Sequence, residues 1–314
     1  MLKLFLIFLM VTLNGVTIVR ADDIANGACK PYRQETNNTS RKNTKLADNI
    51  PYGKGLLWKI TGTDDQFIHL FGTMHSQDRL VTDLPPRARL QLVKSDIFVM
   101  EVLLDEAANQ AFSEAIYFPD DRRLDQLLQP DIYHKLAEKI TGYGISQEML
   151  PHLQPWAAFT LVGRPRPVNA PTQDMKLMQV ARSANVEITA LETMQELLST
   201  LQGIPLADQV EILNDTVCNH AAILKQAREL IDLYLSRDLA GIIKLNDEPH
   251  HDEAVFNRYI ERMLYARNKR MLEKLEGYLE QGNTFVAVGA SHLPGERGLL
   301  NLLAEKDYSV ERVY

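Results

Sequence analysis

Two histidines occupy the same short pattern near opposite ends of the chain. The patterns are Gly72-Thr73-Met74-His75 and Gly289-Ala290-Ser291-His292. Each follows an apolar run, residues 67–71 and 284–288, which is typical of a buried β-strand. A glycine after such a strand lets the backbone turn sharply without a Cβ penalty. We therefore expect both imidazoles at the carboxyl edge of one sheet, where open α/β sheets bind ligands.

One such histidine on its own is more often structural than functional. Two in matching contexts favour a shared site, because neutral imidazole is the commonest metal ligand and the usual general base. The sequence therefore predicts that His75 and His292 converge.

A carboxylate follows the apolar residues 97–100 at the end of another predicted strand. Burying Glu101 is costly unless the carboxylate is paired, hydrogen-bonded or bound to a metal. With His75 and His292 it would form a His/His/Glu set of the kind that binds Zn²⁺, Mn²⁺ or Co²⁺. The alternative is an exposed strand terminus.

An arginine interrupts the apolar stripe of the predicted helix 252–281. The stripe consists of Phe256, Ile260, Leu264, Met271, Leu275 and Tyr278. Arg267 completes this i, i+3/i+4 series, so it should face the core and hold a carboxylate or an anionic ligand. Its guanidinium would otherwise extend to solvent. Asn268 could complete a polar cluster there.

Two further acidic residues are weaker candidates. Asp174 opens the predicted helix 174–183 and is first an N-cap candidate and second a site residue. Glu192 follows the predicted strand 186–191 and, like Glu101, could point into the cleft as a catalytic carboxylate.

Strands and helices alternate along the chain. We expect a hairpin of residues 56–60 and 67–71, a helix at 86–94, a strand at 96–102, a strand at 284–288, a helix at 298–305 and a last strand at 308–313. Residues from about 104 to 250 form a largely helical insertion that contains the strand 186–191. The pattern predicts an α/β (α+β) fold, a mixed central sheet flanked by helices, over residues 55–314.

The first 54 residues differ from the rest. Residues 1–21 combine a basic start, an apolar run and Val19-Arg20-Ala21, which is typical of a secretory signal peptide. Residues 22–54 are polar and aperiodic, and they predict a flexible arm. The expected product is periplasmic or secreted, with no membrane span in the mature chain.

The net charge limits the possible binding partners, and the cysteine content allows one disulfide. Removing residues 1–21 leaves 32 basic against 41 acidic residues, a net charge near −9, which argues against nucleic acid as a partner. Cys29 and Cys218 are the only cysteines. They could form a disulfide in an oxidising compartment or remain two free thiols, and the sequence favours neither.

These motifs together resemble the TraB/GumN family, which is related to the TIKI proteases, the PrgY pheromone-shutdown proteins and, more distantly, erythromycin esterase and the haem-binding ChaN. The resemblance extends over about residues 55–314. It rests on Leu57-Trp58-Lys59-Ile60, the two G-x-x-H motifs, Asp96-Ile97-Phe98-Val99-Met100-Glu101, Asp174, Leu191-Glu192-Thr193 and Arg267-Asn268.

The resemblance implies an erythromycin-esterase/ChaN-like fold and an exported hydrolase, a peptidase, that depends on Mn²⁺, Co²⁺ or Zn²⁺. It implies His75, Glu101 and His292 as metal ligands or acid–base groups, and Arg267 as the residue that stabilises an oxyanion. The substrate would be a peptide or a small molecule. The alternative is a non-catalytic periplasmic binding protein that holds a small ligand, a metal or haem in the same cleft.

Overall fold

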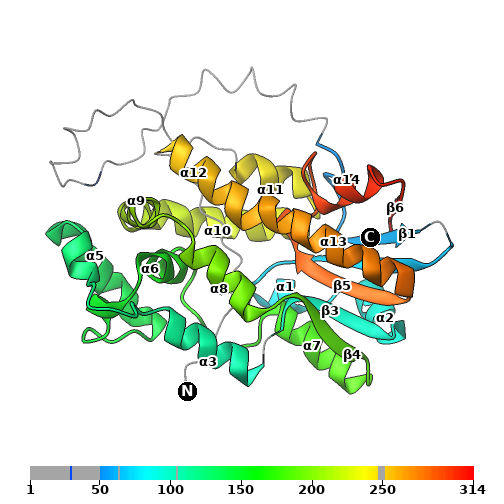
Figure 1. The fold of residues 1–314 in the computed structure, drawn as a ribbon, viewed down its shortest axis with the longest axis horizontal. Coiled ribbons are helices and arrows are strands. Elements are labelled where there is room, and N and C mark those ends of the chain that lie inside the picture. Colours follow the sequence, from blue (N-terminus) through cyan, green and yellow to red (C-terminus); the bar gives the residue numbers. More distant parts are fainter. Residues whose placement is uncertain (1–28, 30–49, 63, 104, 247–251) are drawn as a thin grey trace.

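The computed structural model describes residues 29, 50–62, 64–103, 105–246 and 252–314, and its fold is built on one six-stranded sheet (Figure 1). The strands are β1 (Leu57–Thr61), β2 (Phe67–Thr73), β3 (Ile97–Val102), β4 (Glu187–Glu192), β5 (Thr284–Gly289) and β6 (Ser309–Arg312). Their order is β4-β3-β5-β2-β1-β6. The four strands β4, β3, β5 and β2 are parallel, whereas β1 is antiparallel to β2 and β6. The predicted mixed sheet is confirmed.

Helices lie on both faces of the sheet and form a second region beside it (Figure 1). They are α1 (Arg79–Thr82), α2 (Pro86–Lys94), α3 (Glu106–Ala115), α4 (Leu124–Leu127), α5 (Pro130–Ile140), α6 (Pro155–Val162), α7 (Gln173–Ser183), α8 (Met194–Gln202), α9 (Leu206–Cys218), α10 (His220–Leu235), α11 (Leu239–Asn246), α12 (Glu253–Ile260), α13 (Ala266–Gln281) and α14 (Leu299–Ala304). Short 3₁₀ turns occur at Thr141–Tyr143, Leu150–His152 and Ala290–His292. Among the described residues, no helix has the length and apolar character to cross a membrane.

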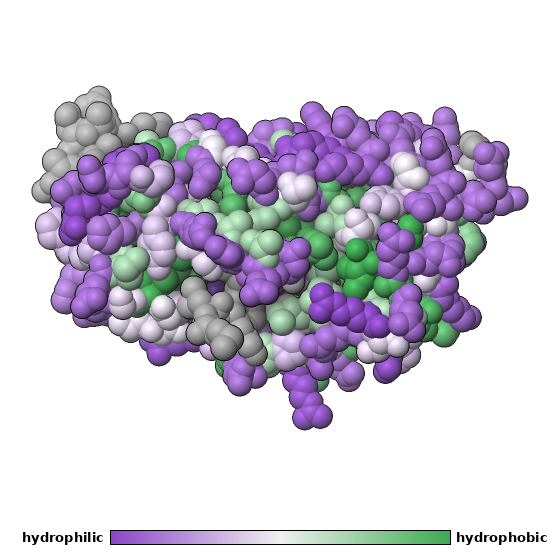
Figure 2. Space-filling model, turned by 60° about the horizontal axis from the view of Figure 1, so that its bottom comes forward, coloured by the Kyte–Doolittle hydropathy of each residue, from purple (hydrophilic) through white to green (hydrophobic). Residues whose placement is uncertain are grey.

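The hydrophobic core has two parts. One surrounds the sheet, where every residue of β5 is buried and Phe285 lies 6.0 Å, ring centre to ring centre, from both Phe71 and Phe98. The other fills the helical region around the fully buried Trp156 and Phe159. Hydrophilic residues cover the outer parts of the face shown in Figure 2, and hydrophobic residues gather in a band across its middle.

The register of the parallel strands brings their carboxyl ends to one edge. Thr73 of β2 lies opposite Gly289 of β5, and Val102 of β3 lies opposite Glu192 of β4. Both G-x-x-H motifs and both strand-end glutamates therefore leave the sheet on the same side.

The predicted helix 252–281 is helical throughout but contains a π turn, Glu261–Tyr265, between α12 and α13. A π turn forms i→i+5 bonds and holds an extra residue. The buried face differs by one position just before and within the turn: Tyr259 and Met263 are buried, whereas the predicted Ile260 and Leu264 are half-buried. From Arg267 to Leu275 the predicted stripe is correct.

The start of the chain is described only in part. The predicted signal peptide 1–21 lies outside the described residues, as does most of the predicted arm 22–54. Residues 50–54 lie against the fold, because Lys54 pairs with Asp238 and the N–H of Gly295 donates to Pro51 O at 2.9 Å.

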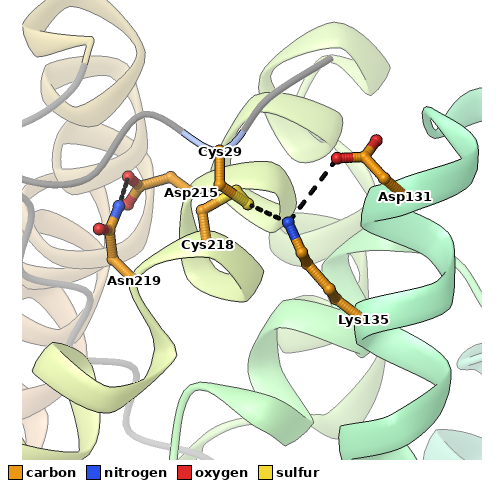
Figure 3. The surroundings of a disulfide bond; sticks show 6 residues. All are labelled: Cys29, Asp131, Lys135, Asp215, Cys218 and Asn219. Atoms are coloured by element: carbon orange, nitrogen blue, oxygen red, sulfur yellow. Dashed lines mark hydrogen bonds and ion pairs between the residues drawn. A yellow bond between two sulfur atoms is a disulfide. The ribbon is translucent and has the colours of Figure 1, made fainter.

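The two cysteines form a disulfide (Figure 3). Cys29 is joined to Cys218 at the end of α9, with 5.2 Å between their Cα atoms, so the first of the two alternatives holds. Lys135 Nζ on α5 lies 3.1 Å from Cys29 Sγ (Figure 3). A residue far from the folded region in sequence is thereby tied to the helical region.

Candidate functional site

A buried arginine joins the two strand-end glutamates. The guanidinium of Arg267, only 3% exposed, donates from Nε to Glu192 Oε2 at 2.8 Å and from Nη2 to Glu101 Oε1 at 2.5 Å. Burial opposes the charged form, but the two carboxylates together hold the pKa of Arg267 above its usual range. Arg267, which the apolar stripe predicted to face the core, is therefore buried and paired with both Glu101 and Glu192.

The two glutamates differ in access. The Glu192 side chain is 1% exposed, and its Oε1 also accepts from Arg270 Nη2 at 3.2 Å, so both of its oxygens are bound by arginines. The Glu101 side chain is 17% exposed, and its Oε2 accepts from the N–H of Gly289 at 2.9 Å. Glu101 is thus the carboxylate that a molecule from outside can approach.

The second histidine lies in the same cluster. His292 is fully buried in the 3₁₀ turn after β5, with Nε2 3.5 Å from Arg267 Nη1 and 3.9 Å from Glu101 Oε1. Burial, followed by the charge of Arg267, holds the pKa of His292 well below its usual range, against the opposing effect of Glu192. The ring is therefore neutral.

Asn268 fixes the orientation of that ring. Its Nδ2 donates to Arg297 O at 2.8 Å and to His292 O at 3.4 Å, which turns its Oδ1 toward His292 Nδ1. An amide oxygen only accepts, so Nδ1 carries the proton and the lone pair is on Nε2, facing Arg267 and Glu101.

The first histidine is held by a different partner. His75 Nδ1 lies 3.1 Å from Asp174 Oδ2, and Thr73 Oγ1 donates to Asp174 Oδ1 at 2.9 Å. Burial raises the pKa of Asp174, but the hydrogen bonds from His75 and Thr73 and the charge of His75 outweigh it, so the pKa is lowered. The N-cap of α7 is Thr172, which corrects the N-cap prediction for Asp174: this carboxylate orients His75.

Two residues that the sequence analysis missed hold the backbone of the first motif. The buried Gln173 accepts from the N–H of Met74 at 2.9 Å and donates to Val81 O at 2.7 Å. Tyr234 OH lies 2.9 Å from both Gly72 O and Gln173 Oε1. No periodicity or spacing marks these residues, since their roles depend on α7 and α10 meeting the end of β2.

The glycine of the first motif, Gly72, serves close packing and not a sharp turn. Gly72 has no positive φ and Gly289 has φ −55°, so the predicted reason for these glycines is wrong. A Cβ on Gly72 would lie 2.8 Å from Leu293 Cδ1 and 3.2 Å from Ala290 Cα. The two motifs therefore pack against each other, and only glycine fits between them.

Of the six predicted site residues, five form one bonded cluster: Glu101, Glu192, Arg267, Asn268 and His292. His75 belongs to the neighbouring cluster with Asp174, at the same sheet edge. Within the described part of the chain, no three His, Cys, Asp or Glu side chains are grouped so as to hold a metal ion. The arrangement is a buried ion cluster beside an oriented imidazole.

Comparison with known proteins gives a match to the model of the TraB/PrgY/gumN family over residues 56–312. The chain is 23% identical to "Metalloprotease TIKI homolog" of Amphimedon queenslandica, over 82% of this chain and 61% of that relative. It is 24% identical to "Metalloprotease TIKI2" of Danio rerio (77% and 58%) and 23% identical to "Metalloprotease TIKI1" of Homo sapiens (81% and 61%). The chain thus spans about three fifths of the length of these relatives.

No solved structure matches this chain. The erythromycin-esterase/ChaN-like fold accordingly stays a prediction, beyond the mixed α/β sheet itself.

Proposed function

This chain belongs to the TraB/PrgY/gumN family, and from that membership together with its site we propose that it is a metal-dependent peptidase. The observation that carries the proposal is the meeting of a neutral imidazole and an accessible carboxylate, His292 Nε2 and Glu101 Oε1, 3.9 Å apart at the sheet edge. The metalloprotease names of the relatives support the same reaction class.

Imidazole and carboxylate groups at this sheet edge are suitable ligands for a divalent cation. In this structure, however, no three such side chains of the described residues are grouped so as to hold a metal ion. We propose His75, Glu101 and His292 as the residues that would hold Mn²⁺, Co²⁺ or Zn²⁺. The hydrogen bond from His75 Nδ1 to Asp174 resembles the carboxylate support that metal-bound histidines commonly have. Against this, Arg267 already contacts Glu101, so a cation would compete with it. A bound metal would polarise a carbonyl or acidify a water.

The protein's own groups divide the remaining roles. Glu101 is the better general base, because one glutamate is accessible and the other, Glu192, is bound by two arginines. Glu192 instead positions Arg267. Arg267, kept charged and rigid, is placed to stabilise negative charge that develops on a substrate oxygen, and Asn268 keeps His292 in its tautomer.

A peptide also needs surface to bind beside these groups. Leu80 and Val168 are 67% and 59% exposed. Gln77, two residues after His75, holds the loop of Val168 in place, since its Oε1 accepts from the N–H of Val168 at 2.9 Å. We propose that these apolar side chains contact the substrate.

The second candidate is a binding protein for a small ligand, a metal or haem. One observation favours it: in the described residues no three potential ligands surround a common point, and Arg267 fills the space between the carboxylates. Such a protein would bind without turnover.

Metal binding is the first test. Purified protein freed of metal and then titrated with Mn²⁺, Co²⁺ or Zn²⁺ should gain thermal stability through linkage. His75→Ala, Glu101→Ala and His292→Ala should each lose most of that gain, and His134→Ala, an exposed histidine on α5, should keep it. If all three site variants bind metal as the unmodified protein does, the ligand set is wrong.

Turnover is the second test. A peptide library incubated with metal-loaded protein should yield cleavage products that disappear with Glu101→Gln. No cleavage with any metal, alongside tight haem or small-ligand binding, would establish the second candidate instead.

We also propose that the chain is exported. The residues 1–21 support it, and so does the disulfide, because disulfides persist in oxidising compartments. The N-terminal sequence of secreted protein should begin at Asp22, and a full-length product retained in the cytoplasm would contradict export.

A further inference from the structure

A pocket of about 640 Å³ lies away from the ion cluster, where β1, β6 and the end of α10 meet. Its lining shares no residue with the proposed peptidase site. Since β1 starts beside the end of β2 and β6 ends beside the start of β1, the lining residues Gly55 and Arg312 lie at the same sheet edge, beyond β2.

Four cations from four separate segments line this pocket: Lys54, Arg87, Arg237 and Arg312. No acidic side chain lines it, and no described carboxylate forms an ion pair with any of the four. The whole chain has a net charge of −7, so this concentration of positive charge runs against the general composition. Like charges gathered in one place repel one another, and a bound anion would relieve that repulsion.

Three contacts fix the arginines in place. Arg87 Nη1 donates to Val313 O at 2.7 Å, Arg312 Nη1 donates to Lys54 O at 3.3 Å, and Arg237 lies 4.4 Å from the ring centre of Tyr314. Each contact leaves further guanidinium N–H groups for a ligand.

The backbone also makes room for this arrangement. Gly55 has φ +122°, and a Cβ there would lie 2.5 Å from Arg312 Cδ. Arg237 itself has φ +60°, in the left-handed region that non-glycine residues rarely adopt. The O atom of Tyr314 already accepts from the N–H groups of Leu56 and Leu57, at 2.7 and 3.2 Å. The backbone oxygens of Val313 and Tyr314 in the lining thus already accept hydrogen bonds.

We propose that this pocket binds a small polyanion, a molecule that carries two or more phosphate or carboxylate groups. The planar guanidinium matches both groups through paired hydrogen bonds. A single phosphate would occupy only part of a pocket this large, and three arginines and a lysine provide more charge than one group needs. The ligand therefore contacts more than one of these four cations.

Calorimetric titration of the full protein with inorganic pyrophosphate and, separately, with citrate tests the proposal. The two probes distinguish phosphate from carboxylate recognition. We expect at least one of them to bind, with an affinity that weakens as salt is raised from low to physiological concentration. The double variant Arg87→Gln, Arg312→Gln should weaken binding at least tenfold.

The matched control is Arg89→Gln, which removes an exposed arginine two residues further along α2 that does not line the pocket. It should bind as the unmodified protein does, and thermal unfolding of each variant checks that the fold is intact. Absence of binding by both probes at millimolar concentration in low salt would overturn the proposal. Equal binding by the control and the double variant would overturn it too. Because binding is measured without turnover, the result is independent of the proposed peptidase activity.

Discussion

The two G-x-x-H motifs share their spacing and their position after a parallel strand, yet their histidines have opposite surroundings. The His75 side chain is 10% exposed and its ring is bonded to a carboxylate, Asp174. His292 is fully buried, is hydrogen-bonded to the side-chain amide of Asn268, and lies close to the guanidinium of Arg267. Burial beside a cation favours the neutral form of the His292 imidazole.

The difference has a structural origin. The first motif meets the N-terminal turn of α7, which brings Gln173 and Asp174. The second meets α13 just after its π turn, which brings Arg267 and Asn268. A short motif therefore places a histidine at the sheet edge, but the helix that packs there decides what the histidine can do.

Removing the cation beside the second motif should give the largest effect. Arg267→Met leaves Glu192 buried between apolar groups and Arg270, and breaking such a pair costs about 3–5 kcal/mol. Urea unfolding should show this loss of unfolding free energy, whereas Arg122→Met, which breaks the exposed pair with Asp120, should leave the unfolding free energy nearly unchanged. A variant with unchanged stability that loses only metal-dependent activity would assign Arg267 to the substrate instead.

A side chain placed between the two G-x-x-H motifs should cause the next largest loss of stability. Gly72→Ala would press a methyl group against Leu293 and Ala290, at a cost of about 1–3 kcal/mol. Gly277→Ala is the matched control: nothing lies within 4 Å of its Cβ position in α13, so it should stabilise the protein by about 0.5–1 kcal/mol. Thermal unfolding should therefore give shifts of opposite sign, and two shifts of the same sign would contradict the close packing of the motifs.

Removing one hydrogen bond from Asp174, the carboxylate that holds His75, should have a smaller effect on stability. Thr73→Val removes the hydrogen bond to Asp174 Oδ1 and should cost about 1–2 kcal/mol. The lost donor should also raise the pKa of Asp174, which can be followed by NMR titration of the carboxyl carbon. Thr73→Ser, which keeps the hydroxyl, should restore the low pKa; a Val variant with the same Asp174 pKa would show that Thr73 has no part in holding His75.

The smallest predicted effect is a pH dependence from His69, which precedes the first motif on β2. Burial and the charge of Lys59 lower the pKa of His69 to about 4. Between pH 6.5 and 4 the unfolded chain then binds more protons than the folded one, so stability falls as the pH decreases through that range. After allowance for the partial exposure of the ring, we expect a loss of about 1 kcal/mol.

His69→Gln should flatten the unfolding free energy over the same range, whereas His134→Gln, at an exposed position on α5, should leave the profile as it is. A profile unchanged by His69→Gln would show that the acid sensitivity arises from other groups.

Much of the fold was readable from the sequence because local patterns and tertiary structure agree there. The hairpin, the helix Pro86–Lys94 and the strands around Glu101, Glu192 and Gly289 lie within a residue or two of their predicted ranges. Arg267 was also identifiable, since a cation on an apolar stripe must be paired when it is buried.

The sequence could not supply what depends on elements distant along the chain. It left the pairing of Cys29 with Cys218 open and misplaced two buried positions at the π turn, because neither proximity nor a π turn has a local pattern. Only the folded chain placed α7 against the first motif and α13 against the second. The sequence determined which residues reach the sheet edge, since strand ends are local, and tertiary packing decided that one imidazole meets a carboxylate and the other a guanidinium.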